Sequence, residues 1–210
     1  MKNSFYLFCR FMLFILLKIL FFFRVQGRGF VPPRGGCIIA SNHLSYLDPV
    51  VLSVASPRIL SFMAKKELFS EHGKFFKWLI TTLNAFPLER GTADLKAIRF
   101  AINKLKTGHC LIVFPEGTRG SSGEVKNPQA GVSMLAAKAN VLVIPAFITG
   151  TDNALPAKSK KIALFTPMNV KFGPALTFKQ DLSKNDIKAD YQMFSNQIVE
   201  QIKQLGNKKK

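Results

Sequence analysis

Short apolar runs alternate with amphipathic helical patterns through the middle of this chain. Three such runs lie at residues 37–40, 110–114 and 141–147, and turn residues precede the first of them. Helical patterns at residues 92–107 and 127–139 separate the runs. Strands that alternate with helices are typical of an α/β fold. The sequence therefore predicts a mainly parallel central sheet flanked by helices.

Capping residues predict where three helix ends lie. Asn127 and Pro128 would supply the N-cap and the first-turn proline of one helix, and Asn140 would close it. Apolar residues recur every three or four positions from 187 to 205. That spacing predicts a closing amphipathic helix, with Gly206 as its stop.

The charge and composition of the chain limit the classes of molecule that it is expected to bind. A chain of 210 residues, 48 % of them apolar, is expected to form one domain with its own core. Its net charge of +18 implies an anionic partner, which could be a nucleic acid, a membrane surface or an acidic small molecule. Twenty Phe against three Tyr and one Trp favour lipid over base stacking.

The N-terminal segment, residues 4–25, is apolar but unlike a signal peptide or a membrane span. No small-residue cleavage site follows it, and Arg10 and Lys18 interrupt the apolar run. On a helix, Lys2, Arg10, Lys18 and Arg24 fall within roughly 160° of one another. We therefore expect an amphipathic helix that lies in the headgroup plane with its basic side toward anionic lipid. The alternative is a helix packed on the domain.

Domain boundaries follow from these patterns. We expect residues 1–26 to form the membrane-associating helix, residues 27–206 to form the globular domain, and residues 207–210 to be a basic tail. The three cysteines, Cys9, Cys37 and Cys110, are scattered and odd in number. They predict reduced thiols in a cytosol-facing protein rather than a disulfide framework or a zinc site.

Each predicted central strand runs into a polar loop: "SNHLSYLD", "PEGTRG" or "ITGTDN". The carboxyl ends of parallel strands meet at one edge of a sheet, where ligands bind in open α/β folds. If the three strands are parallel, the neighbours at this edge include residues far apart in the sequence: His43, Asp48, Glu116 and Arg119.

His43 and Asp48 could form a base and its orienting carboxylate. A neutral imidazole can take a proton from an attacking hydroxyl, and a carboxylate on its other nitrogen fixes the tautomer. No Gly-x-Ser-x-Gly elbow is present, so the hydroxyl would belong to a substrate and the acyl transfer would be direct. The structural alternative for Asp48 is a plain helix cap before Pro49.

The segment "FPEGTRG" has the composition of an anion-binding turn. Gly117 lets backbone amides approach a ligand, Thr118 offers a hydroxyl, and Arg119 can bind a phosphate through two N–H groups. The alternative is an exposed charged turn after a strand. Arg90 in "AFPLERG" and Lys65 in "SFMAKKELF" would each be unremarkable alone.

Together, "NHLSYLD", "FPLERG", "FPEGTRG" and "VIPAFITG" resemble the motifs of the lysophosphatidate acyltransferase family, in order and spacing. The resemblance runs from about residue 27 to about residue 176. It implies transfer of a fatty acyl chain from acyl-CoA or acyl carrier protein to the sn-2 hydroxyl of 1-acyl-glycerol-3-phosphate, giving phosphatidate. With the amphipathic N-terminal helix and the reduced cysteines, we expect a monotopic or peripheral protein at the cytoplasmic face of the cell membrane. We expect no cofactor, no metal, no acyl-enzyme and no nucleic-acid partner.

The resemblance also assigns roles to individual residues. His43 matches the general base and Asp48 the residue that orients it, while Pro145 matches a proline associated with the acyl donor. The residues that match positions at or near the acceptor's phosphate are Arg90, Glu116, Gly117, Thr118, Arg119 and Lys65.

Two departures from the family pattern leave the acceptor open. Residues 144–146 read Ile-Pro-Ala rather than Val-Pro-Val, and residues 128–130 read Pro-Gln-Ala where many relatives carry Phe-Lys-Lys. The alternatives are another lysophospholipid or a lyso-aminolipid as acceptor. A more remote alternative is a non-catalytic basic module that binds membrane or nucleic acid.

Overall fold

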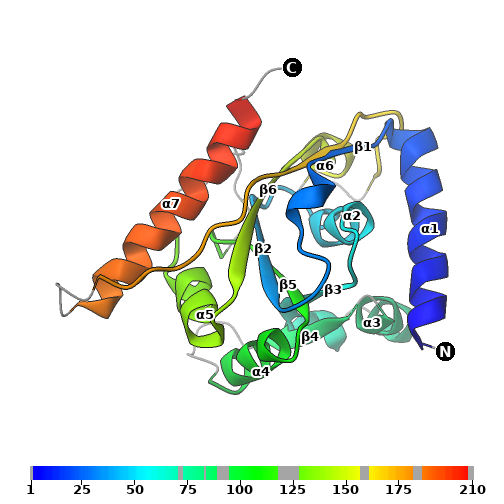
Figure 1. Ribbon diagram of the computed structural model, residues 1–210. Coiled ribbons are helices and arrows are strands. Elements are labelled where there is room, and N and C mark those ends of the chain that lie inside the picture. The colour runs from blue at the N-terminus through cyan, green and yellow to red at the C-terminus, as the bar shows by residue number, and fades with distance from the viewer. Residues whose placement is uncertain are drawn as a thin grey trace.

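A seven-stranded sheet forms the centre of the protein (Figure 1) in the computed structural model, which describes residues 2–70, 73–82, 84–88, 95–117, 128–156, 161–181 and 186–207. In spatial order the strands are β1 (Arg24–Gln26), β7 (Asn169–Phe172), β6 (Leu142–Thr149), β2 (Cys37–Ser41), β5 (Cys110–Val113), β3 (Leu60–Lys65) and β4 (Ala85–Leu88). Only β6 and β7 pair antiparallel among these described strands. The predicted mainly parallel sheet is therefore confirmed.

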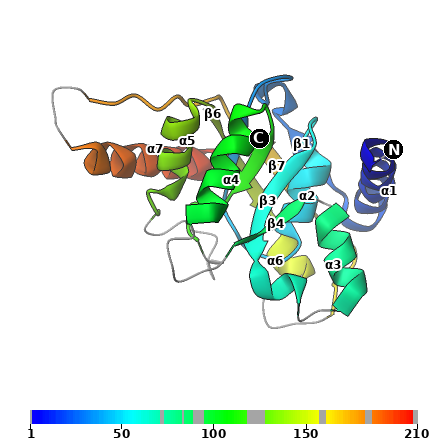
Figure 2. The same cartoon turned by 90° about the horizontal axis from the view of Figure 1, so that it is seen from below.

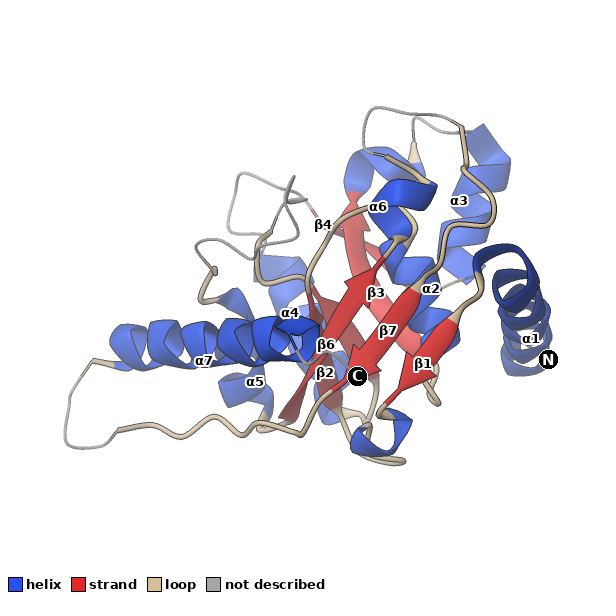
Figure 3. Ribbon diagram, turned by 90° about the horizontal axis from the view of Figure 1, so that it is seen from above, coloured by secondary structure: helices blue, strands red, loops and turns tan. Residues whose placement is uncertain are grey.

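Helices cover both faces of this sheet. They are α1 (Lys2–Phe21), α2 (Asp48–Ala55), α3 (Gly73–Thr82), α4 (Leu95–Lys106), α5 (Gly131–Ala139), α6 (Thr151–Ala154) and α7 (Ile187–Asn207), with 3-10 turns η1 (Arg28–Phe30) and η2 (Lys66–Phe69). Helices α4, α5 and α7 lie on one side, and α1, α2 and α3 on the other (Figure 2, and from the opposite direction Figure 3).

The central strands are buried on both faces, as their continuous apolar runs predict. Alternate residues of β2 enter different cores. Cys37 and Ile39 pack with α1 and α2, while Ile38 and Ala40 pack with α4, α5 and α7. All five residues of β2 are buried. This fixed register holds the end of β2, and the loop that follows it, in one place.

Two predicted helix ends are wrong. Helix α5 begins at Gly131, because Pro128 and Gln129 form a loop in which the backbone N–H of Gln129 donates to the Pro115 carbonyl (2.9 Å). The predicted N-cap, Asn127, lies outside the described residues. Helix α7 runs through Gly206 to Asn207. A Cβ at Gly206 would lie 2.7 Å from the Phe147 ring, so glycine serves close packing there. The predicted end of α5 at Asn140 is confirmed by its left-handed conformation (φ 51°).

Helix α1 packs on the domain and also exposes an apolar face. Tyr6, Leu17 and Phe21 are buried in the core. Arg10 turns inward and donates to the carbonyls of Ser56 and Arg58 (3.2 and 3.3 Å), so its predicted position toward lipid is wrong. The exposed apolar residues of the α1 face are Leu7, Phe8, Phe11, Met12, Ile15, Leu16, Ile19 and, just after the helix, Phe22. No helix within the described ranges is both long and apolar enough to span a bilayer.

The segment after α1 joins the sheet. Residues 24–26, which the sequence groups with the N-terminal helix, form β1 and pair in parallel with β7 from Arg24↔Asn169 to Gln26↔Lys171. The Phe22 ring lies 6.4 Å from that of Phe165, and the Phe165 amide donates to the Leu20 carbonyl (2.7 Å). These contacts fix the end of α1 against the domain.

Candidate active site

Polar loops from three neighbouring strands meet at the carboxyl edge of the sheet. Strand β2 pairs in parallel with β5 and with β6, so the residues after all three strands lie at the same edge. The loop after β2 carries His43, the loop after β5 carries Glu116, and α6 after β6 begins with Thr151. The predicted convergence of these loops is confirmed.

Asp48 is the centre of this arrangement. Its Oδ2 lies 2.7 Å from His43 Nδ1 and accepts the backbone N–H groups of Leu44 (2.6 Å) and Ser45 (2.8 Å). Its Oδ1 accepts the hydroxyl of Thr151 (2.6 Å). Asp48 is fully buried, so these four partners replace its hydration. The amides that it accepts precede α2, and Asp48 therefore closes the His43 loop rather than simply capping the helix.

The imidazole of His43 is held in one orientation. Its ring stacks on Phe114 with centroids 4.0 Å apart and planes 15° apart, and Nδ1 faces Asp48. An ionised carboxylate only accepts hydrogen bonds, so in the neutral imidazole the proton lies on Nδ1 and Nε2 keeps its lone pair. The side chain is 14 % exposed, which leaves a path for a substrate. His43 can therefore take a proton from a bound hydroxyl.

Glu116 joins the β5 loop to the His43 loop. Its Oε1 accepts the backbone N–H of His43 (3.3 Å). Burial raises the pKa of Glu116; the bond from His43 opposes the rise, and the charge of Asp48 adds to it. Glu116 thus helps to fix the backbone of His43 at the carboxyl edge of the sheet.

Gly117 follows in a conformation that favours glycine (φ 68°). A Cβ at this position would also lie 2.8 Å from Nε2 of Gln129. The loop before α5 therefore packs directly on the Glu116 loop. In this contact an uncharged side chain, Gln129, lies beside the start of "GTRG".

Asn42 and Thr151 belong to the site although sequence reasoning did not single them out. The amide group of Asn42 is fully buried and makes two bonds with Ile148 of β6: it donates to the carbonyl (3.0 Å) and accepts from the N–H (2.8 Å). Thr151 lies in the "ITGTDN" loop, whose position was predicted. A threonine in a loop carries no signal of its own, and its partner Asp48 is 103 residues away.

The structure describes only some of the other predicted site residues. Arg90, Thr118 and Arg119 lie outside the described residues, and Lys65 ends β3 with its side chain outside the described part. Pro145 lies inside β6 opposite Ala40, and its carbonyl accepts from Gly173 (2.8 Å). The roles assigned to all five remain predictions. Within the described part of the chain no three His, Cys, Asp or Glu side chains cluster as a metal site.

Comparison with known proteins gives consistent matches. A family model described as Acyltransferase matches residues 22–149, the part that contains His43, Asp48 and Glu116. A 1-acyl-sn-glycerol-3-phosphate acyltransferase of Streptococcus pneumoniae is 32 % identical over an alignment of 184 positions that covers 82 % of this chain and 64 % of that protein. One of Bacillus subtilis is 28 % identical over 97 % of this chain and 98 % of its own length.

A solved structure agrees with the fold. The crystal structure of PlsC, the 1-acyl-sn-glycerophosphate (LPA) acyltransferase of Thermotoga maritima, matches with a TM-score of 0.65 and 31 % identity. The match covers 86 % of this chain and 72 % of that one. The sheet and its flanking helices are thus shared along most of both chains.

Proposed function

This chain belongs to the acyltransferase family, and from that premise we propose that it acylates the free sn-2 hydroxyl of 1-acyl-glycerol-3-phosphate to give phosphatidate. The observation that carries the proposal is the His43–Asp48 pair, 2.7 Å apart, in which Nε2 of the imidazole bonds to none of the described residues and can act as a base. The names of the relatives support the acceptor. The acyl donor would be a thioester, either acyl-CoA or acyl carrier protein.

The reaction follows from the orientation of His43. Nε2 takes the proton of the sn-2 hydroxyl as its oxygen attacks the thioester carbonyl. The new ester C–O bond forms, the C–S bond breaks, and the departing thiolate takes the proton back from the imidazolium. Asp48 holds Nδ1–H throughout and stabilises the transient positive charge. No covalent acyl-enzyme is needed, because the nucleophile is the acceptor itself.

Thiol release by the purified protein in mixed micelles tests the proposal. With palmitoyl-CoA and lysophosphatidate, the wild-type protein should release CoA thiol and form phosphatidate. If no thiol were released from palmitoyl-CoA but turnover occurred with palmitoyl-acyl carrier protein, the donor would be acyl carrier protein. If both donors failed with lysophosphatidate and with a panel of other lyso-lipids, the acyltransferase assignment would have to be abandoned.

The loop that Glu116 and Gly117 begin carries the proposed phosphate ligands. Arg119, with Thr118, would bind the acceptor's phosphate, and Arg90 and Lys65 would assist. A guanidinium suits this role because it binds phosphate through two parallel N–H groups.

Arg119→Ala should therefore raise KM for lysophosphatidate by about tenfold or more, since a hydrogen bond to a charged group contributes roughly 1.5–3 kcal/mol. The KM for the acyl donor should change much less. Initial rates with each substrate varied in turn measure both constants. Equal increases in the two constants would exclude a role specific to the acceptor's phosphate.

A second acceptor class is compatible with the uncharged side chain of Gln129 beside Gly117. The site then lacks positive charge at the position where the family pattern has lysine, which suits another lysophospholipid or a lyso-aminolipid. The acceptor panel separates these candidates by kcat/KM. A non-catalytic binding module would release no thiol with any of them.

We also propose that the α1 face rests on the membrane surface. Its exposed apolar residues run along the whole helix, and exposed Ile162, Leu164 and Phe165 extend it beside Phe22. An enzyme that works in the interface avoids exposing the acceptor's acyl chain, which costs about 0.8 kcal/mol per CH₂. This arrangement supports peripheral or monotopic attachment, which we propose to be at the cytoplasmic face.

Sedimentation with lipid vesicles tests the α1 face. The double variant Phe8→Ser/Phe11→Ser should bind vesicles about 10²-fold or more weakly, because each of the two Phe side chains contributes roughly 1.5–3 kcal/mol when buried. Leu95→Ser/Met193→Ser is a matched control, since both residues are similarly exposed but lie on α4 and α7. Equal binding by the two double variants would show that α1 does not contact the membrane.

A further inference from the structure

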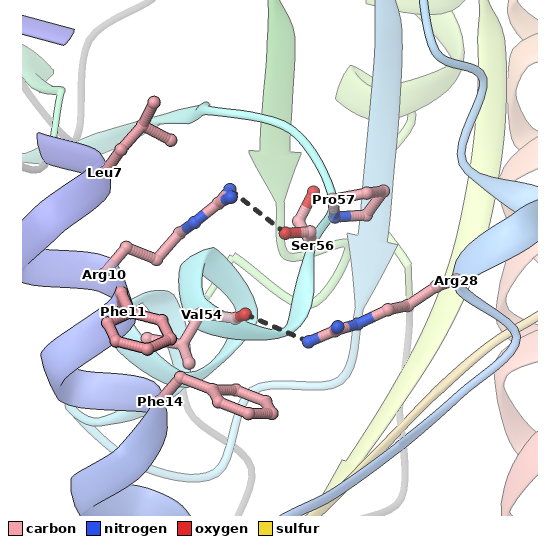
Figure 4. Close-up of a pocket in the computed structure, with 8 residues that line it drawn as sticks. All are labelled: Leu7, Arg10, Phe11, Phe14, Arg28, Val54, Ser56 and Pro57. Atoms are coloured by element: carbon pink, nitrogen blue, oxygen red, sulfur yellow. Dashed lines mark hydrogen bonds between the residues drawn. The ribbon is translucent and has the colours of Figure 1, made fainter. Parts of the chain in front are cut away.

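A cleft separate from the His43 site lies between α1 and the carboxyl end of α2 (Figure 4). Its volume is about 310 Å³, within the range of small-molecule pockets. Arg10 of α1 and Arg28 of η1 point into it from opposite sides, and Leu7, Phe11, Phe14 and Val54 form apolar walls. A cleft with two cationic groups and apolar walls suits an anionic amphiphile.

Both arginines donate to backbone carbonyls at or just after the carboxyl end of α2. Arg10 donates to the carbonyls of Ser56 and Arg58, and Arg28 donates through Nε to Ala55 (2.8 Å) and through Nη2 to Val54 (3.5 Å). The carboxyl end of a helix offers only about half a negative charge. Two full positive charges therefore exceed what the end of α2 neutralises.

No carboxylate of the described residues balances the remaining charge. Arg10 and Arg28 both bond to backbone carbonyls there, and neither pairs with an Asp or Glu side chain. Burial lowers the pKa of Arg28, and the nearby charge of Arg10 lowers it further. Lys18 adds a third cation beside the same wall, 5.8 Å from the Phe14 ring, which Arg28 approaches to 5.3 Å.

Both guanidinium groups keep donors for a ligand. A guanidinium has five N–H donors. The bonds to α2 use Nη1 of Arg10 and Nε and Nη2 of Arg28, so Nη2 of Arg10 and Nη1 of Arg28 have no acceptor in the described part of the chain. An anion placed between them would accept from both and would balance the excess charge.

We propose that this cleft binds the phosphate of an anionic phospholipid at the membrane surface. The apolar walls continue into the α1 face through Leu7 and Phe11, both of which are exposed, so a lipid that leaves its chains in the bilayer could reach the arginines with its headgroup. The cleft lies at the Ala55 end of α2, and Asp48 lies at the other end, about 10 Å away at 1.5 Å per residue. The proposal rests on the proposed membrane contact of α1 but not on acyl transfer.

Side-chain NMR on the wild-type protein tests the cleft directly. Arginine Nε–Hε signals are followed during titration with dihexanoyl-phosphatidylglycerol below its micelle concentration, with dihexanoyl-phosphatidylcholine and inorganic phosphate as separate arms. Arg10→Lys and Arg28→Lys assign the two signals. Both signals should shift saturably with phosphatidylglycerol, hardly at all with phosphatidylcholine, and with inorganic phosphate only at concentrations at least tenfold higher. Unmoved signals, or equal response to free phosphate, would overturn the proposal.

Vesicle sedimentation provides a second test that does not depend on activity. Arg10→Gln/Arg28→Gln should bind phosphatidylglycerol vesicles about tenfold more weakly than Arg34→Gln/Arg99→Gln, because it also loses the contacts to the headgroup. Both double variants lose the same charge and therefore the same general attraction to the anionic surface. Arg34 and Arg99 are exposed and line no part of the cleft. Binding to phosphatidylcholine vesicles should be equal in the two. Equal loss on anionic vesicles would mean that only net charge matters and would refute a defined site.

Discussion

His43→Ala should lose 10²–10⁴-fold in kcat, the range expected for removal of a general base, while its unfolding transition stays close to that of the wild type. The activity should fall because no other group in the described site can accept the proton of the attacking hydroxyl at the position of Nε2. Stability should change only modestly, because the buried Asp48 keeps three of its four donors and the imidazole itself is partly exposed. Thiol release in mixed micelles and thermal unfolding measure the two quantities on the same preparation.

His109→Ala is the matched control. His109 is exposed, and its Nδ1 contacts Thr107 and the Lys104 carbonyl near the end of α4. It should release thiol at the wild-type rate. A folded His43→Ala protein with wild-type turnover would remove His43 from the mechanism and with it the direct-transfer scheme.

Asp48→Asn should have the second-largest effect, a loss of about 10²–10⁴-fold in kcat. An amide at this position can still accept some of the bonds to Leu44, Ser45 and Thr151, but it no longer requires the proton of His43 to lie on Nδ1. The other tautomer carries its proton on Nε2 and cannot act as a base. A buried mismatch of donors should also cost about 1–3 kcal/mol in the free energy of unfolding.

Thr151→Val separates the roles of the Asp48 contacts. It removes one hydroxyl donor from Oδ1 and leaves the contact between Oδ2 and His43. We expect a loss of about tenfold, well below that of Asp48→Asn, because one hydrogen bond to a charged group contributes roughly 1.5–3 kcal/mol. Thr151→Ser should restore the rate. Full activity in Asp48→Asn would show that Asp48 is structural alone.

The sequence predicts the arrangement of strands better than the contacts around the site. The continuous apolar runs of β2, β5 and β6 are long enough to identify buried strands, and the helices between them imply parallel pairing. From this the meeting of the His43 and Glu116 loops follows. The bond between Thr151 and Asp48 does not follow, since it joins residues 103 positions apart through a side chain that is common in any loop.

Helix α1 shows the limit of periodicity. The spacing of its charges identifies a helix with two sides but not which side the domain covers. Arg10 turns inward because the carbonyls at the end of α2 need donors, and those carbonyls belong to a segment more than forty positions away. Gly206 is a similar case. The sequence predicts that it ends the helix, whereas the structure shows that close packing on the Phe147 ring leaves no room for a Cβ there.

The pairing of β1 with β7 has a consequence for how the protein is made. Helix α1 and β1 leave the ribosome before β7 does, and Arg24 cannot meet Asn169 until the residues between them have been synthesised. At roughly 5–20 residues per second, this delay lasts on the order of ten seconds. During that time the buried side of α1 has no core to enter, and both of its sides are open to solvent or to lipid. Early contact with a bilayer would shield the nascent helix from aggregation, so membrane targeting and folding would begin as one event.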